Sequence, residues 1–117
     1  MRLLFICSRN QWRSPTAEAV YQKDPRVQVR SAGLSQVART RVSEKLLQWA
    51  DLVCVMEQEH KQRLREAFPG VFRDLRIEVL DIPDEYPYMD PVLVGEIVNR
   101  VEPLIEAETA GGFPDGP

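Results

Sequence analysis

Residues 3–14 read Leu-Leu-Phe-Ile-Cys-Ser-Arg-Asn-Gln-Trp-Arg-Ser, and they combine a strand, a loop and a helix start. The apolar residues before Cys7 predict a strand buried on both faces of a parallel sheet. Ser14 and Pro15 are typical of a helix N-cap followed by proline at the first helical position. The intervening loop is long enough to curl around one tetrahedral anion with its N–H groups pointing inward. The stretch therefore predicts an anion-binding loop between a strand and a helix.

The same loop carries a candidate nucleophile and a candidate cation. The helix N-terminus and a nearby guanidinium favour the reactive thiolate form of Cys7, although an isolated cysteine is more often a small buried hydrophobe. Arg13 offers a planar fork of donors for two phosphoryl oxygens, where the alternative is a surface salt bridge. Ser14 is either a donor to Cys7 or an N-cap, and the two roles are compatible. We expect a left-handed backbone at Asn10, which is well tolerated by asparagine.

Bulk properties favour one domain that is not built for nucleic acid or membranes. The chain has 117 residues, 44% of them apolar, and a net charge of −3. No global basic field attracts nucleic acid or an anionic membrane, and no apolar stretch is long enough for a bilayer. Met1-Arg2 leads directly into the first strand without a signal-peptide pattern. We expect one domain at residues 1–108 and a flexible tail at residues 109–117, which is rich in Gly and Pro.

Cysteine and histidine usage predicts a reduced protein without a metal or cofactor. Cys7 and Cys54 do not form a disulfide framework, so the expected location is the cytoplasm. Cys54 lies in the middle of an apolar run and is interpreted as core. His60 is the only histidine and is interpreted as a solvated helix residue. No His/Cys cluster has the spacing of metal ligands.

Strand-like and helix-like segments alternate along the chain. Strands are expected at residues 3–6, 27–30, 51–56 and 77–80, and helices after Ser14, after Ser43, at residues 57–68 and after Asp90. Ser31-Ala32-Gly33 is interpreted as a small-residue turn, and Pro103 is expected to kink or end the last helix. The predicted fold is an α/β three-layer sandwich with a parallel sheet of about four strands and a phosphate-binding loop after the first strand.

Ligands of such sheets bind at the carboxyl ends of the strands. Four suggestive segments follow predicted strands and are expected to converge on one rim: 7–13, 31–33, 56–57 and 81–88. The last segment supplies candidate proton donors, namely Asp81, Asp84, Glu85 and Asp90. Asp90 is most simply an N-cap, and Asp81 directly follows the strand. Asp84 is our preferred acid because it lies further out in the loop, but the loop pattern alone does not separate it from Glu85.

The pattern Cys7-x5-Arg13-Ser14-Pro15 after an apolar strand, followed by Ala-Glu-Ala, resembles the low-molecular-weight protein tyrosine phosphatase family. The likeness covers most of the chain. Ser31-Ala32-Gly33 resembles the family's S-A-G turn, Ala38-Arg39 its A-R segment, and Asp51 to Met56 its D-L-x-x-x-M strand. Pro83-Asp84 with the tyrosines after it resembles the acid-bearing loop. The compact chain resembles a small bacterial branch of predicted tyrosine phosphatases within this family.

The resemblance implies two-step hydrolysis of a phosphomonoester through a phosphocysteine. Cys7 would attack phosphorus, and Asp84 would protonate the leaving oxygen and then activate water. The phosphate would be held by Arg13 and by the loop residues Ser8, Arg9, Asn10, Gln11, Trp12 and Ser14. Asn10, Ser14 and Ser31 would form a supporting hydrogen-bond network. The expected partner is a phosphorylated protein, with phosphotyrosine as the first choice, or a small phosphomonoester.

The chain departs from the family pattern around the loop. The family usually has glycine where this chain has Arg9, which adds charge at the rim and favours a more anionic substrate. Trp12 stands where many members have a second cysteine, so a protective disulfide is not expected there. The segment between Gly33 and Ala38 is shorter than in typical members, and Asp84 is followed by Glu85 rather than proline.

Two other functions fit parts of the pattern. Arsenate reduction uses the same fold but requires further cysteines near the loop, and Cys54 is poorly placed for that. A phosphate or phosphopeptide-binding module with little turnover would use the same loop. Turnover separates this module from a phosphatase, because a module binds phosphate but leaves p-nitrophenyl phosphate intact.

Overall fold

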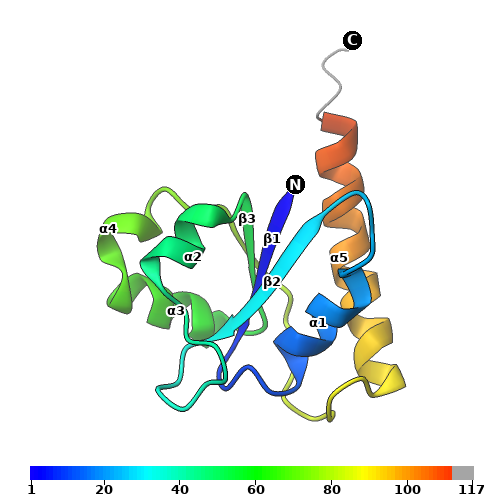
Figure 1. Ribbon diagram of the computed structural model, residues 1–117, viewed down its shortest axis with the longest axis horizontal. Helices are drawn as coiled ribbons and strands as arrows, with labels where there is room; N and C mark the ends of the chain where they lie inside the picture. Colours follow the sequence, from blue (N-terminus) through cyan, green and yellow to red (C-terminus); the bar gives the residue numbers. More distant parts are fainter. Residues whose placement is uncertain (112–117) are drawn as a thin grey trace.

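The computed structural model describes residues 1–111 and arranges helices on both faces of a parallel sheet (Figure 1). The strand order is β2-β1-β3-β4, and all three pairings are parallel. The strands are β1 (Arg2–Cys7), β2 (Gln28–Gly33), β3 (Leu52–Val55) and β4 (Ile77–Val79). The helices are α1 (Arg13–Tyr21), α2 (Glu44–Trp49), α3 (Gln58–Ala67), α4 (Pro69–Phe72) and α5 (Pro91–Gly111). The predicted three-layer α/β fold with four strands is confirmed.

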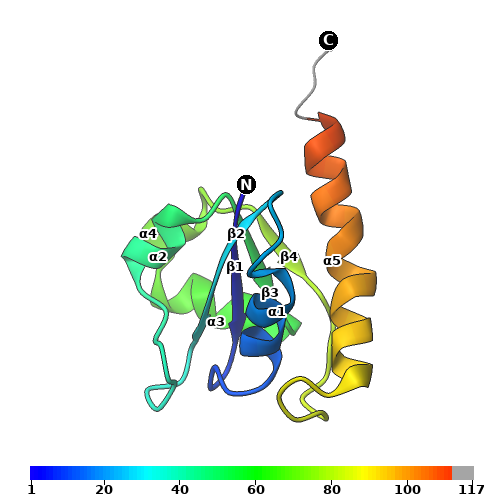
Figure 2. The ribbon, with the colours of Figure 1, turned by 45° about the vertical axis from the view of Figure 1, so that its right-hand side comes forward.

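The central strand β1 divides the core into two clusters. Its alternate side chains Leu3, Phe5 and Cys7 face a cluster that also contains apolar residues of α1 and α5. Leu4 and Ile6 face the second cluster, which contains apolar residues of α2 and α3. Figure 2 shows α1 and α5 on one side of the sheet and α2, α3 and α4 on the other. A strand covered on both faces must be apolar throughout, which explains the run before Cys7.

We predicted a turn at Ser31-Ala32-Gly33, but this segment is the end of strand β2. It pairs with Phe5, Ile6 and Cys7 of β1. Its small residues allow the loop after β1 to approach the strand closely. A Cβ at Gly33 would lie 2.6 Å from the carbonyl oxygen of Ser8 and 2.7 Å from Cβ of Ala38. The loop after β1 thus lies directly against this strand end.

Helix α5 begins after Asp90, as predicted, but it ends later than predicted. Asp90 caps the helix, because its Oδ1 accepts the Val92 N–H at 2.8 Å. Pro103 lies inside the helix and does not end it, since the buried neighbours Val101 and Ile105 keep the helix packed on the core. The helix continues past residue 109 to Gly111, into the predicted tail, whose residues 112–117 lie outside the described part of the chain. Among the helices of residues 1–111, none is long and apolar enough to cross a membrane.

Candidate active site

The loop between β1 and α1 forms the floor of a pocket of about 330 Å³. Its lining residues are Cys7, Ser8, Arg9, Gln11, Trp12, Arg13 and Asp84. Cys7 and Arg13 are each only 3% exposed, so the thiol and the guanidinium lie at the bottom of the pocket. Helix α1 begins at Arg13 and directs the partial positive charge of its N-terminus toward the same space. The pocket therefore combines a nucleophile with several features that attract an anion.

Ser14 is hydrogen-bonded to the candidate nucleophile Cys7 and is not the helix N-cap that we predicted. Helix α1 starts at Arg13, two residues earlier than predicted, and Ser14 lies within its first turn. Its Oγ is 2.9 Å from Sγ of Cys7 and 3.4 Å from the carbonyl oxygen of Ala32. The Asn10 amide donates to the same Oγ at 3.0 Å, so the Ser14 hydroxyl proton has two acceptors, and the sulfur is the nearer. Ser14 is therefore arranged to donate to a Cys7 thiolate.

Asn10 holds the loop in its curled shape. Its φ of 56° confirms the predicted left-handed backbone. The side-chain amide donates both to Ser14 and, at 2.9 Å, to Oγ of Ser31. Ser31 in turn donates to Glu18 at 2.6 Å. The predicted grouping of Asn10, Ser14 and Ser31 is thus one connected network, extended by Glu18 of α1.

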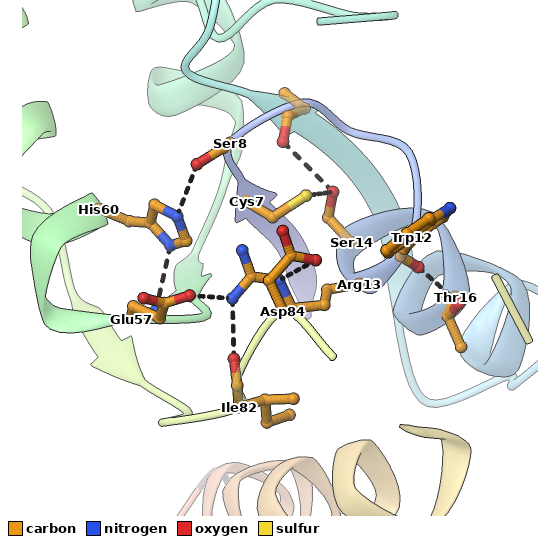
Figure 3. A network of polar contacts seen from close by, with 11 residues as sticks. Cys7, Ser8, Trp12, Arg13, Ser14, Thr16, Glu57, His60, Ile82 and Asp84 are labelled. Carbon is orange, nitrogen blue, oxygen red and sulfur yellow. Dashed lines mark hydrogen bonds and ion pairs between the residues drawn. The ribbon is translucent and has the colours of Figure 1, made fainter. Parts of the chain in front are cut away.

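Arg13 is anchored through Nη1 and faces Asp84 with Nε (Figure 3). Its Nη1 donates to the Ile82 carbonyl at 2.8 Å and to a carboxylate oxygen of Glu57. Its Nε lies 3.7 Å from Oδ1 of Asp84. Nη1 is fixed by two acceptors, whereas Nε has the longer 3.7 Å ion pair with Asp84, so the Nε–Nη2 edge can make a bidentate contact with an anion that takes the place of Asp84. The sequence identified Arg13 but did not identify Glu57 as its anchor.

His60 is buried, which corrects the interpretation as a solvated residue. It is 0% exposed, and its Nδ1 accepts the backbone N–H of Glu57 at 3.1 Å. The ring proton therefore lies on Nε2, which donates to Oγ of Ser8 at 3.2 Å. Burial, with a further effect of the nearby Arg13 cation, lowers the pKa of His60 to about 4, so the ring is neutral. The available sequence signal was a Glu-x-x-His pattern at a helix start directly after a buried strand.

The acid-bearing loop places only one of its four predicted candidate acids in the pocket lining. Asp84 lines the pocket with its side chain 57% exposed, whereas Glu85 is exposed and is not part of the lining. Asp90 caps α5, and Asp81 has a φ of 62° at the start of the loop. Together, the contacts of Arg13 and Asn10 join all four predicted strand-end segments. Their convergence on one rim is confirmed.

Cys54 belongs to the core, as predicted. It is 0% exposed, and burial raises the pKa of its thiol to about 12. Both cysteines are free thiols. Within residues 1–111, no group of three or more His, Cys, Asp or Glu side chains is arranged to hold a metal ion.

The chain is similar to known phosphatases in sequence and in structure. No family model matches the sequence. A protein-arginine-phosphatase of Bacillus subtilis is 33% identical over 101 residues, covering 63% of this chain and 67% of that protein. The YwlE arginine phosphatase from Geobacillus stearothermophilus superposes with a TM-score of 0.75 at 23% identity, covering 94% of both chains.

A low-molecular-weight protein tyrosine phosphatase from T. tengcongensis superposes with a TM-score of 0.73 at 22% identity, covering 92% of this chain and 99% of that one. At these identities the two superpositions establish the common fold. The relative that is 33% identical shows the family relationship. In this chain, the motif from Cys7 to Pro15 spans the end of β1, the loop and the start of α1. The chain belongs to the low-molecular-weight protein tyrosine phosphatase family of cysteine phosphatases.

Proposed function

We propose that the pocket hydrolyses phosphotyrosine in proteins, with Cys7 as nucleophile, Arg13 as phosphate ligand and Asp84 as general acid. The observation that carries this proposal is the meeting of the three groups in one pocket of about 330 Å³. The loop backbone from Ser8 to Ser14 supplies further donors for the phosphoryl oxygens. The roles of Cys7, Arg13 and Asp84 are compatible, because each side chain acts on a different atom of the same phosphate group.

In the first step, the Cys7 thiolate attacks phosphorus and forms a sulfur–phosphorus bond while the phosphorus–oxygen bond to tyrosine breaks. Arg13, through its Nε–Nη2 edge, and the loop N–H groups stabilise the charge on the three equatorial oxygens. Asp84 transfers its proton to the leaving phenolic oxygen. Tyrosine leaves, and the phosphocysteine remains.

In the second step, water attacks the phosphorus of the phosphocysteine and transfers a proton to the Asp84 carboxylate. The sulfur–phosphorus bond breaks, and phosphate is released. The departing thiolate is stabilised by the Ser14 hydroxyl at 2.9 Å. The enzyme then returns to its starting state, with Asp84 protonated and Cys7 as the thiolate.

Phosphoarginine is a second candidate substrate, because the relative that is 33% identical is a protein-arginine-phosphatase. Arg9 favours phosphotyrosine instead. It lines the pocket, and its guanidinium makes no ion pair with any residue in the described part of the chain. The guanidinium of phosphoarginine would be repelled by the Arg9 cation, whereas the phenyl ring of phosphotyrosine is neutral.

The chemistry requires a reduced Cys7. The two free thiols support a reducing compartment, and the cytoplasm stays our prediction. A phosphorylated protein is the proposed partner.

Hydrolysis of p-nitrophenyl phosphate by the wild-type chain tests the reaction. We expect turnover, and we expect Cys7→Ser and Arg13→Ala to lose nearly all of it. Binding of phosphate without turnover by the wild type would favour the binding module and refute the phosphatase. Phosphotyrosine and phosphoarginine peptides of the same flanking sequence then decide between the two substrates.

A further inference from the structure

We propose that an apolar shelf beside the pocket binds an apolar residue next to the phosphorylated residue of a protein substrate. The shelf consists of Trp12, Tyr88, Met89 and Val92, whose exposed fractions are 42%, 52%, 42% and 54%. Among the described residues, Val37 is the only other large apolar side chain so exposed. The backbones of Trp12 and Met89 lie close together because both bond to Thr16, and Tyr88 and Val92 are close to Met89 in the chain. Clusters of exposed apolar side chains mark interaction sites. This inference rests on the proposed function and specifies its substrate.

One buried hydroxyl joins the two segments that form the shelf. Thr16 is 0% exposed and donates from Oγ1 to the carbonyl of Trp12 at 2.6 Å. The same Oγ1 accepts the backbone N–H of Met89 at 2.9 Å. Figure 3 shows Thr16 beside Trp12 at the start of α1. The anion-binding loop and the acid-bearing loop are therefore fixed against each other at this point.

Met89 is held in a conformation that exposes it. Its φ is 63°, in the left-handed region that a long side chain rarely adopts. The hydrogen bond to Thr16 holds that backbone in place, and the side chain remains partly in solvent instead of joining the core. Strained backbone of this kind is concentrated at ligand-binding positions.

The shelf continues the catalytic pocket, because Trp12 belongs to both. A small phosphomonoester fills the pocket without reaching Met89 or Val92. An extended polypeptide advances about 3.3 Å per residue, so the neighbours of the phosphorylated residue lie over the rim. A protein segment with an apolar neighbour is thus the occupant that uses both parts. A second copy of the chain on the same surface would instead cover the pocket mouth.

Peptide binding to the Cys7→Ser protein tests the shelf without requiring turnover. The probes are phosphotyrosine peptides with leucine or serine on both sides of the phosphorylated residue, and a matching phosphoarginine pair. We expect the leucine peptide of the preferred pair to bind about tenfold more tightly, the effect of burying part of an apolar side chain. Met89→Asn, which tolerates the left-handed backbone, and Val92→Thr should each reduce this preference at least threefold. Val37→Thr is the matched control and should leave the preference unchanged.

Equal binding of leucine and serine peptides, or a preference that survives both shelf variants, overturns the proposal. A dimer in sedimentation that Val92→Thr dissociates without changing the preference overturns it as well and assigns the shelf to a second copy. Hydrolysis of p-nitrophenyl phosphate by Met89→Asn and Val92→Thr should match the wild type. Failure of the wild type to hydrolyse this compound refutes the proposed function, whereas the peptide preference decides the shelf.

Discussion

Replacing His60 with glutamine is expected to remove a pH dependence of folding stability that the buried imidazole creates. The neutral ring accepts from the Glu57 backbone and donates to Ser8, so protonation at Nδ1 would break the first of these bonds. The unfolded chain takes up the proton near pH 6.5, whereas the folded protein holds the pKa at about 4. Lower pH therefore favours the unfolded state. The contribution of the neutral His60 to the free energy of unfolding is fully present above pH 6.5 and is lost as the pH falls toward 4.

The magnitude follows from the two pKa values. A difference of about 2.5 corresponds to about 3 kcal/mol in total. Between about pH 7 and pH 5, the loss of unfolding free energy is about 2 kcal/mol. Asp24, whose pKa is lowered to about 2 mainly by its hydrogen bonds with Arg26, contributes only at lower pH. His60 is the only histidine in the chain, so this window isolates it.

Urea unfolding followed by tryptophan fluorescence measures the effect. Both proteins carry Cys7→Ser, so that ionisation of the catalytic thiol does not contribute. Glutamine is the matched replacement, because its amide offers one acceptor and one donor group and does not titrate. We expect the His60→Gln protein to lose about 2 kcal/mol less than its parent between about pH 7 and pH 5. The same loss in both proteins would refute the assignment of a buried neutral imidazole.

Three further changes test the site. Glu57→Ala removes one of the two anchors of the Arg13 guanidinium and should lower kcat/KM by about tenfold, whereas the same change at its exposed neighbour Glu59 should have no effect. Equal effects would contradict the anchoring. Asp84→Asn should lower kcat on phenyl phosphate about a hundredfold and Glu85→Gln much less, and the reverse order would identify the other acid. Native Cys54, with a pKa of about 12, should resist iodoacetamide at about pH 8 while the other thiol reacts, and Cys54→Ala should keep most activity; peptide mapping of the alkylated protein checks this.

The elements that the sequence predicted well are those governed by local rules. The apolar run before Cys7 can satisfy burial only in a central parallel strand, and the structure places it there. The left-handed residue was predictable at Asn10, because a tight loop without glycine needs a residue that tolerates positive φ. The helices predicted after Ser43 and Asp90 were also correct, and both residues cap them, since a cap requires only its own side chain and the next turn.

The errors arose where contacts outside the regular helix and strand patterns decide the outcome. Ser14 is a residue type typical of N-caps, but its hydroxyl is hydrogen-bonded to Cys7 and Asn10, and the helix begins two residues earlier than predicted. His60 lies in a charged segment, but it is buried and hydrogen-bonded to Ser8 of the anion-binding loop. These residues are separated by 52 positions in the sequence, a distance that no local pattern spans.

Gly33 fixes how the anion-binding loop responds to its ligand. The backbone of Ser8 and Asn10 lies so close that no side chain fits between the loop and the end of β2. The loop carbonyls of Cys7 and Ser8 accept N–H groups from the chain just after this glycine, at 3.1 and 2.8 Å. The shape of the loop is therefore held by the protein's own contacts. Binding then requires little ordering of the chain, so most of the interaction energy remains available as affinity.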